Sequence, residues 1–183
     1  MPDSAIYYAQ LHYDFAKEIG LKKEMAVAKN TQATAFYLMG DYAKAINLYY
    51  ESLKTKEEIK DTLAQAVSWN NIGMVNDEQG FYDEASENYN KAIATLKSIE
   101  DKDNPELQTT LAASYQNLGV SYTDTKPELA LEYFYKALKI ADTLKLERDQ
   151  AYAYNNLANI YSDQNDKAKA LEYYQRGLEL LKK

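Results

Sequence analysis

Small and apolar residues recur at spacings of three and four along most of the chain. Four segments align on one small residue each, and we call these residues the anchors: Ala33, Gly73, Gly119 and Ala158. An alanine stands seven residues before each anchor, and a long or aromatic side chain stands four residues before it. Offsets of three and four place these side chains on one face of an α-helix. The pattern therefore predicts four copies of one helix, which we call helix A.

A second pattern follows each anchor by 11 or 12 residues and reads small–x3–aromatic–x2–small. Its four copies are Ala45–Tyr49–Ser52, Ala85–Tyr89–Ala92, Ala130–Phe134–Ala137 and Ala170–Tyr174–Gly177. Small residues let two helices approach closely, and the aromatic ring fills the groove beside them. The pattern predicts a helix B after each helix A. We expect Trp69, Tyr115 and Tyr154, each four residues before an anchor, to pack between helices A and B of their own hairpin.

Short turns separate the two predicted helices of each hairpin. Gly40, Gly80 and Asn165 stand at three of these turns, and Gly or Asn can take the left-handed conformation that ends a helix. Asn104 is the predicted cap of the third helix A, and Pro105 is its predicted first residue.

The two patterns together predict an all-α fold, a right-handed α-solenoid of about nine helices. With only 6 Gly and 3 Pro, the chain has few turn residues for a sandwich or barrel. Ala9, Tyr13 and Ala16 show the helix B spacing with no helix A before them. The predicted segments of this single solenoid are an unpaired helix B at 1–22 and repeats at 23–59, 60–102, 103–145 and 146–183.

The anchors and their neighbours resemble the tetratricopeptide repeat. Trp69-x2-Ile72-Gly73 and Tyr115-x2-Leu118-Gly119-x2-Tyr122, each followed by the helix B pattern, carry the resemblance. Anchor spacings of 40, 46 and 39 residues exceed the usual period of about 34. They are similar to the long-helix variety found in kinesin light chains, Gram-positive peptide receptors and sensory regions of bacterial signalling proteins. The resemblance implies a module that binds a protein or an extended peptide.

Amide side chains gather just before the anchors. Three residues before them stand Asn30, Asn70, Gln116 and Asn155, and two residues before them stand Thr31, Asn71, Asn117 and Asn156. Asn is a poor helix former, so its recurrence at these helical positions indicates a role other than helix formation. A side-chain amide offers a donor and an acceptor that match a peptide unit.

We therefore predict that these amides line one concave peptide-binding groove. In the resembling families this face of helix A lines the concave surface, and its Asn side chains contact bound peptides. With two neighbours that follow anchors, the predicted groove residues are Asn30, Asn70, Asn71, Met74, Gln116, Asn117, Asn155, Asn156 and Asn159. The alternative is that the amides bond neighbouring repeats or coat a wet groove.

Net charge and composition limit the classes of partner and the compartments that this chain is expected to have. The net charge of −7 repels phosphate backbones, so no nucleic-acid partner is expected. The lack of Cys excludes disulfides, thiolate zinc sites and cysteine nucleophiles. No stretch approaches the ~18 apolar residues of a membrane span, and the N-terminus does not have the form of a signal peptide. We expect no direct membrane insertion. The cytoplasm is the default compartment, and the periplasm stays open if the chain belongs to a membrane sensor.

No catalytic or metal-binding motif is recognisable. His12 is the only histidine and has no partners at a suitable spacing, so we expect no catalytic residue, no metal and no cofactor. Some Gram-positive receptors of the resembling type are phosphatases, but their catalytic residues lie in an added N-terminal bundle. This chain begins directly in repeats, so we expect it not to be an enzyme.

The terminal helices carry apolar faces without a predicted cover. The last helix has Leu171, Tyr174, Leu178 and Leu181 on one face, and the first has Ile6, Ala9, Tyr13 and Ala16. Large exposed apolar patches are uncommon on soluble monomers. A homodimer through the terminal helices, most simply a two-fold contact between the last helices, is therefore expected. A self-associating scaffold is the alternative to a binding module in a signalling protein.

Overall fold

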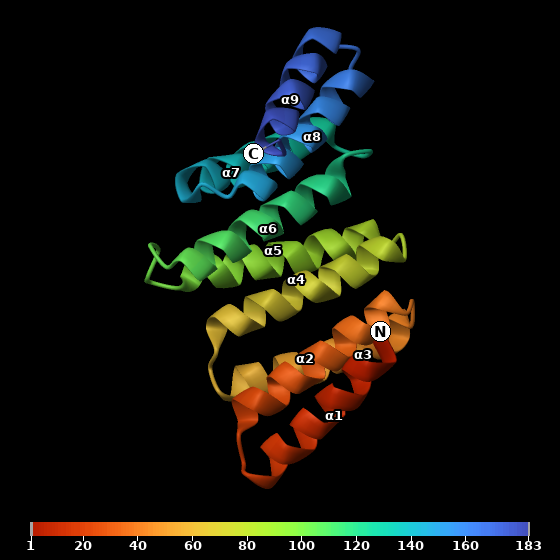
Figure 1. The fold of residues 1–183 in the computed structure, drawn as a ribbon, viewed down its shortest axis with the longest axis vertical. Helices are drawn as coiled ribbons and strands as arrows, with labels where there is room; N and C mark the ends of the chain where they lie inside the picture. The colour runs from red at the N-terminus through yellow and green to blue at the C-terminus, as the bar shows by residue number, and fades with distance from the viewer. Residues whose placement is uncertain (1, 183) are drawn as a thin grey trace. The chain divides into compact units, whose positions relative to one another are not determined.

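The computed structural model describes residues 2–182, which form nine α-helices, as the sequence predicts (Figure 1). The helices are α1 Pro2–Glu18, α2 Lys22–Leu38, α3 Tyr42–Glu58, α4 Thr62–Glu78, α5 Tyr82–Ser98, α6 Pro105–Tyr122, α7 Pro127–Leu144, α8 Glu147–Asp163 and α9 Lys167–Leu180. Met1 and Lys183, the outer limits of the predicted solenoid, lie outside the described residues. The all-α prediction is confirmed.

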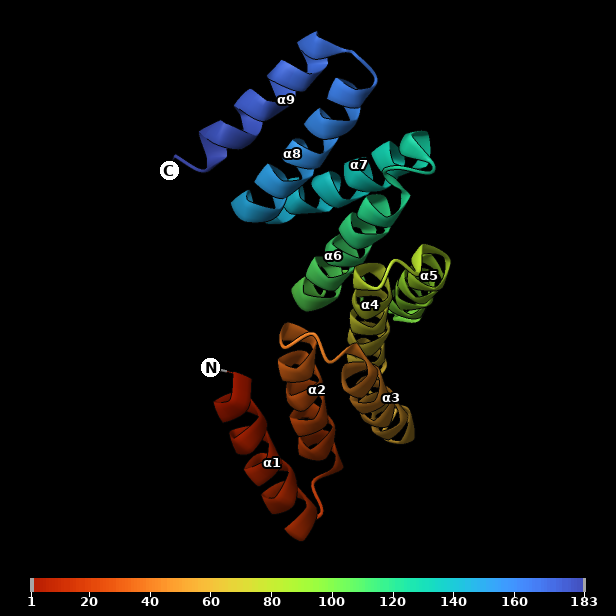
Figure 2. The same ribbon diagram turned by 90° about the vertical axis from the view of Figure 1, so that its right-hand side faces the viewer.

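The helices group into two compact units, one at Met1–Ile99 and the other at Glu100–Lys183. The first unit holds α1 to α5 and the second holds α6 to α9. Within each unit, every helix packs against the next one along the chain, joined to it by a short turn (Figures 1 and 2). The predicted A–B hairpins are α2–α3, α4–α5, α6–α7 and α8–α9.

The helix ends follow the predicted turn chemistry. Gly40 and Gly80 both have φ of 78°, and Asn165 has φ of 61°, so all three take the left-handed conformation. Asn104 accepts hydrogen bonds from the backbone N–H groups of Glu106 and Leu107, and Pro105 begins α6. These predictions are confirmed. Lys60 and Lys145 also take positive φ, at 57° and 56°, although no Gly or Asn marks those turns.

The anchors are small because an aromatic ring of helix B lies directly on them. A Cβ added to Gly73 would meet Tyr89 Cε1 at 2.6 Å, and one added to Gly119 would meet Phe134 Cε1 at 2.9 Å. Both rings are almost completely buried. This contact holds α4 against α5 and α6 against α7 with little space between the helices.

Each core is built where a helix A packs onto the preceding helix B. The first unit's cluster joins α2, α3 and α4 and contains Ala33, Ala45, Tyr49, Leu53, Ile72 and Val75. The second unit's cluster joins α7 and α8 and contains Ala130, Phe134, Leu138, Ala153, Leu157 and Ile160.

The aromatic side chains four residues before the anchors pack in two ways. Tyr115 stacks on Tyr133, and Tyr154 stacks on Tyr173, so both lie within their own hairpins as predicted. Trp69 differs from this prediction because it bridges two hairpins. Its ring meets Tyr50 of α3 edge-on at 6.2 Å between centroids, while Lys91 of α5 places its ammonium 4.9 Å from the ring.

The predicted register of the first helix is wrong by four residues. At the end of α1, the backbone N–H of Leu21 donates to the carbonyl of Ala16. At the end of α3, the backbone N–H of Asp61 donates to the carbonyl of Lys56 in the same way. Ala16 therefore corresponds to Lys56, whereas the sequence pattern matches it with Ser52. Ala9 and Ala16 are buried, on the face of α1 that packs on α2. Different apolar side chains are exposed on α1, namely Tyr7, Tyr8, Leu11 and Phe15, and Ile19 is exposed directly after the helix.

Candidate binding surfaces

In the first unit, the predicted groove amides form a polar cluster between helices. Asn71 Nδ2 on α4 donates to Asn30 Oδ1 on α2 at 3.4 Å. Asn30, Asn71 and Met74 are half-buried, while Asn70 is only 8% exposed. The Asn30–Asn71 bond joins neighbouring hairpins, which is the alternative role that the sequence left open.

Lys56 joins this cluster, and the sequence analysis missed it. Its ammonium donates to Ser68 Oγ at 2.7 Å and to Asn30 Oδ1 at 3.4 Å, and the residue is 5% exposed. Among residues 2–182, no carboxylate lies within ion-pair distance of it. Burial lowers the pKa of Lys56 to about 8, and the charge of Asp61 opposes that shift. Nothing in the sequence distinguishes Lys56 from the exposed lysines of α3.

In the second unit, the predicted amides separate into inter-helix bonds and exposed groups. Gln116 is buried, and its Nε2 donates to the carbonyl of Asp149 at 3.1 Å, which ties α6 to the first turn of α8. Asn156 donates to the carbonyl of Tyr152 in its own helix. Asn117 and Asn156 are half-buried, whereas Asn155 and Asn159 are exposed.

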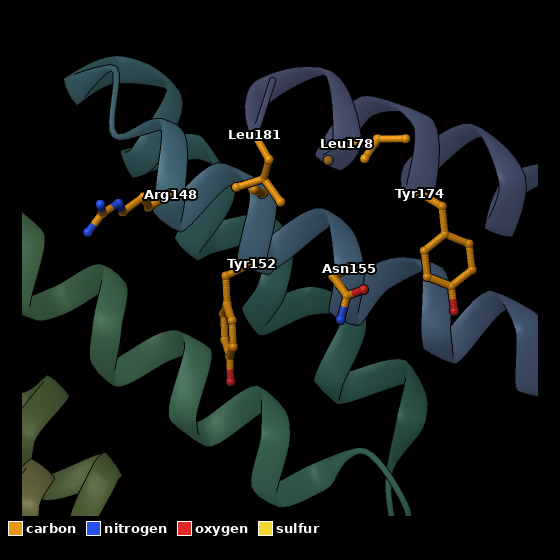
Figure 3. Close-up of a pocket in the computed structure, with 8 residues that line it drawn as sticks. Arg148, Tyr152, Asn155, Tyr174, Leu178 and Leu181 are labelled. Carbon is orange, nitrogen blue, oxygen red and sulfur yellow. The ribbon is translucent and has the colours of Figure 1, made fainter. Parts of the chain in front are cut away.

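One of the exposed amides, Asn155, lies at a hollow of about 540 Å³ between α8 and α9. Asn155 lies between the rings of Tyr152 and Tyr174, and Leu178 of α9 and Leu181 at its C-terminal end border them (Figure 3). The hydroxyl of Tyr174 donates to Asn159 Oδ1 at 2.6 Å. The complete lining is Arg148, Ala151, Tyr152, Asn155, Tyr174, Gly177, Leu178 and Leu181. A concave apolar surface with a few polar groups has the general form of a ligand site.

The apolar face predicted on the last helix is exposed in the structure. Leu171 is 58% exposed, Leu178 53% and Leu181 69%, with Tyr174 at 41%. Three of these four side chains line the hollow, while Leu171 does not.

A tyrosine cluster on the second unit is also absent from the sequence prediction. The hydroxyl of Tyr135 lies 3.0 Å from that of Tyr161 and 2.8 Å from that of Tyr173. The Tyr161 and Tyr173 rings stack 5.6 Å apart. Burial, followed by the two hydroxyl contacts, raises the pKa of Tyr135. The cluster joins α7, α8 and α9 through their side chains and lies outside the hollow.

Other site types find no support in the part of the chain that the structure describes. There, no group of three or more His, Asp or Glu side chains is placed to hold a metal ion. His12 Nε2 lies 3.0 Å from Glu24 Oε2, on neighbouring helices. No helix among the described residues is both long and apolar enough to cross a membrane.

Comparisons with known proteins agree with the fold. Regulatory protein RapK of Bacillus subtilis is 28% identical over 139 residues, which are 75% of this chain and 36% of RapK. Tetratricopeptide repeat protein 29 of Trypanosoma brucei brucei is 32% identical over 75 residues, 41% of this chain and 16% of that protein. The chain thus spans only about a sixth to a third of these relatives.

Solved structures show the same helical arrangement. The crystal structure of BtubC from P. vanneervenii matches 98% of this chain and 73% of its own at a TM-score of 0.82 and 23% identity. The apo form of RapI matches 98% of this chain and 48% of its own at a TM-score of 0.80 and 19% identity. The family model described as tetratricopeptide repeat matches residues 24–98 and 109–183. The chain therefore belongs to the tetratricopeptide repeat family.

Proposed function

We propose that this chain binds a peptide or a segment of another protein as the regulatory or sensory part of a bacterial signalling protein. The observation that carries the proposal is the apolar hollow between α8 and α9, with the exposed amide of Asn155 inside it. Similarity to the regulatory protein RapK supports the regulatory setting. The proposed role is binding without catalysis.

The proposed recognition divides between apolar and amide groups. Leu178, Leu181 and Tyr152 offer apolar surface that a ligand covers, which supplies most of the affinity. Asn155 offers a donor and an acceptor to a ligand backbone, which fixes its position. In the first unit, Asn30, Asn71 and Met74 are only half-buried, and we propose them as a second region of contact.

A random-peptide selection on the intact chain tests this function. We expect selected peptides to shift the NMR resonances of Asn155 and its neighbours. We also expect Asn155→Ala to weaken their binding about tenfold, because a buried ligand carbonyl or N–H loses its partner. Asn47→Ala is the matched control, since Asn47 is an exposed asparagine on α3. Recovery of no binding peptide, or equal weakening by both substitutions, would contradict the proposed site.

A self-associating scaffold is the second candidate, and the outer surface of α1 favours it. Tyr7 is 61% exposed, Tyr8 68% and Phe15 61%, so three aromatic rings face solvent on one helix. Exposed apolar patches of this kind often mark contacts with other proteins. A homodimer through α1 is the form of this alternative that the structure favours.

A further inference from the structure

Each unit contains a groove that one of its own helices already fills. In the first unit, α4 packs in the groove between α2 and α3, and in the second, α8 packs against α7 beside α6. The helices that fill the grooves present the same pattern, small–x3–aliphatic–x2–aliphatic. It consists of Ser68, Ile72 and Val75 on α4 and of Ala153, Leu157 and Ile160 on α8, all at most 1% exposed.

The hollow between α8 and α9 corresponds to the groove that α8 covers. Phe134, Leu138 and Ala141 of α7 lie against α8 and are 0%, 8% and 0% exposed. Their counterparts, 40 residues later, are Tyr174 and Leu178 on α9 and Leu181 at its C-terminal cap, which are 41%, 53% and 69% exposed. The same face is therefore buried on α7 by a helix and uncovered on α9 among the described residues.

Polar groups at the hollow repeat the contacts that orient α8. Gln116 of α6 donates to the carbonyl of Asp149 in the first turn of α8, and Asn155 is its counterpart at the hollow. Arg148, in the first turn of α8, lines the hollow together with Leu181, and its side chain extends outward from the hollow's edge (Figure 3). A helix N-terminus favours acidic side chains, and α8 itself begins with Glu147 and Asp149.

We propose that the hollow between α8 and α9 binds an amphipathic α-helix of a partner protein. The partner helix has an acidic first turn beside Arg148 and presents the small–x3–aliphatic–x2–aliphatic pattern to Gly177 and Leu178. Gly177 lines the hollow and has no side chain that would occupy it, and a Cβ at that position would meet the carbonyl of Ala151 on α8 at 3.4 Å. This inference rests on the proposed binding function and defines its ligand as a helix instead of an extended peptide.

A second copy of the chain does not meet this description. The two stripes that carry the pattern, on α4 and α8, are buried inside their own units. The exposed residues of α1 are mostly large and aromatic, with Tyr7, Leu11 and Phe15 at spacings of four, so they do not present a small residue to Gly177. The described residues of a second copy therefore do not supply the required helix, and the proposed occupant is a helix of another protein.

The sequence of α8 supplies a defined probe, because α8 fills the corresponding groove inside the chain. The probe is a capped peptide of residues 147–163 with a side-chain cross-link between positions 155 and 159, which are both exposed on α8. The cross-link leaves Ala153, Leu157 and Ile160 available to contact the hollow. The cross-link is needed because an isolated helix of this length is marginal in water. We expect it to bind the intact chain with a Kd of ~100 µM or tighter, measured by fluorescence anisotropy.

Substitutions on α9 locate the peptide. Leu178→Asp should weaken binding at least tenfold, while Leu171→Asp, at an equally exposed leucine outside the hollow, should change it less than twofold. A peptide with Leu157→Asp should also bind at least tenfold more weakly. Arg148→Glu should weaken the native-sequence peptide about fivefold at low salt, and a peptide with Glu147→Lys and Asp149→Lys should recover that loss.

Three results would overturn the inference. They are the absence of binding at 1 mM peptide, equal effects of Leu178→Asp and Leu171→Asp, and a dimer of the peptide-free chain that Leu178→Asp dissociates. The last result would show that a second copy of the chain occupies the hollow. Peptides selected from a random library that still bind through Asn155, or through Asn71, would leave the proposed function intact while the helix inference fails.

Discussion

At the scale of single residues, Lys56 is a buried cation, whereas the corresponding residues in the other repeats are apolar: Ala16, Leu96, Ala141 and Leu181. Its hydrogen bonds go to neutral oxygens of Ser68 and Asn30. Its pKa in the folded chain is about 8, against 10.5 for the unfolded chain. The folded state therefore binds fewer protons than the unfolded state between these values. Charge on Lys56 opposes folding below about pH 8, and this cost disappears as the pH rises toward 10.5.

Replacing Lys56 by Met should therefore stabilise the chain at pH 7, by about 1–2 kcal/mol. The free energy of unfolding, measured in urea, should differ less between the two proteins as the pH rises from 8 to 10. Lys54→Met is the matched control, since Lys54 is exposed on the same helix, and it should have little effect. A stabilisation that is the same at pH 7 and pH 10 would exclude the titration of Lys56 as its cause.

The glycines of helix A and helix B differ in what surrounds them. Gly73→Ala should lower the free energy of unfolding by about 1–3 kcal/mol, because the buried Tyr89 ring is held by its hydroxyl on Asp77 at 2.8 Å. Gly177→Ala should be neutral or stabilise by up to about 1 kcal/mol, since its Cβ would make ordinary contacts and Ala favours helix. Thermal and urea unfolding of both variants provide the measurement. Equal losses in the free energy of unfolding at the two positions would show that contact with the aromatic ring is not the reason for a glycine at the anchor.

At the scale of helices, α7 and α9 share one sequence pattern but are buried to different extents. Buried residues on α7 are Ala130, Phe134, Ala137, Leu138 and Ala141, whereas on α9 they are only Ala170 and Gly177. Few buried apolar contacts mean a low free energy of local opening. α9 is therefore the helix of the second unit on which a ligand in the hollow acts most directly.

Hydrogen exchange should follow this difference in burial. We expect backbone amides in the middle of α9 to exchange at least tenfold faster than those in the middle of α7. The cross-linked α8 peptide should slow exchange in α9 and leave α3 unchanged. Mass spectrometry of the intact chain, digested after labelling, measures both effects. Equal protection of α7 and α9 without peptide would argue against an uncovered face in solution.

At the scale of the whole molecule, the scaffold alternative predicts self-association through the outer face of α1. Sedimentation from about 1 to 100 µM should show reversible dimers if this face is an interface, because its aromatic rings leave water on contact. Phe15→Glu should abolish the dimers, and Leu171→Asp should leave them intact. A chain that stays monomeric at 100 µM would remove the scaffold alternative and leave the binding module as the proposed function.

The sequence by itself determined the helices, their order, the helix ends that Gly, Asn or Pro marks, and the family. These features follow from residues near one another along the chain. Spacings of three and four define a helical face, while Gly80, Asn104 and Asn165 act on the backbone of their own turns. The anchors also predicted close contact with helix B, because a repeated pattern indicates a repeated packing arrangement.

Only the tertiary structure decided which side chains of a predicted face are covered. Asn30, Gln116 and Asn155 occupy one repeat position, yet Gln116 is buried against α8 and Asn155 is exposed at the hollow. In the sequence, Lys56 is one of several lysines on α3. Its burial becomes apparent only in the structure, where Ser68 of α4 contacts its ammonium. The physical reason is that burial depends on which helix packs over a face, and that neighbour lies in another part of the chain. Periodicity defines each helical face but not the helix that covers it.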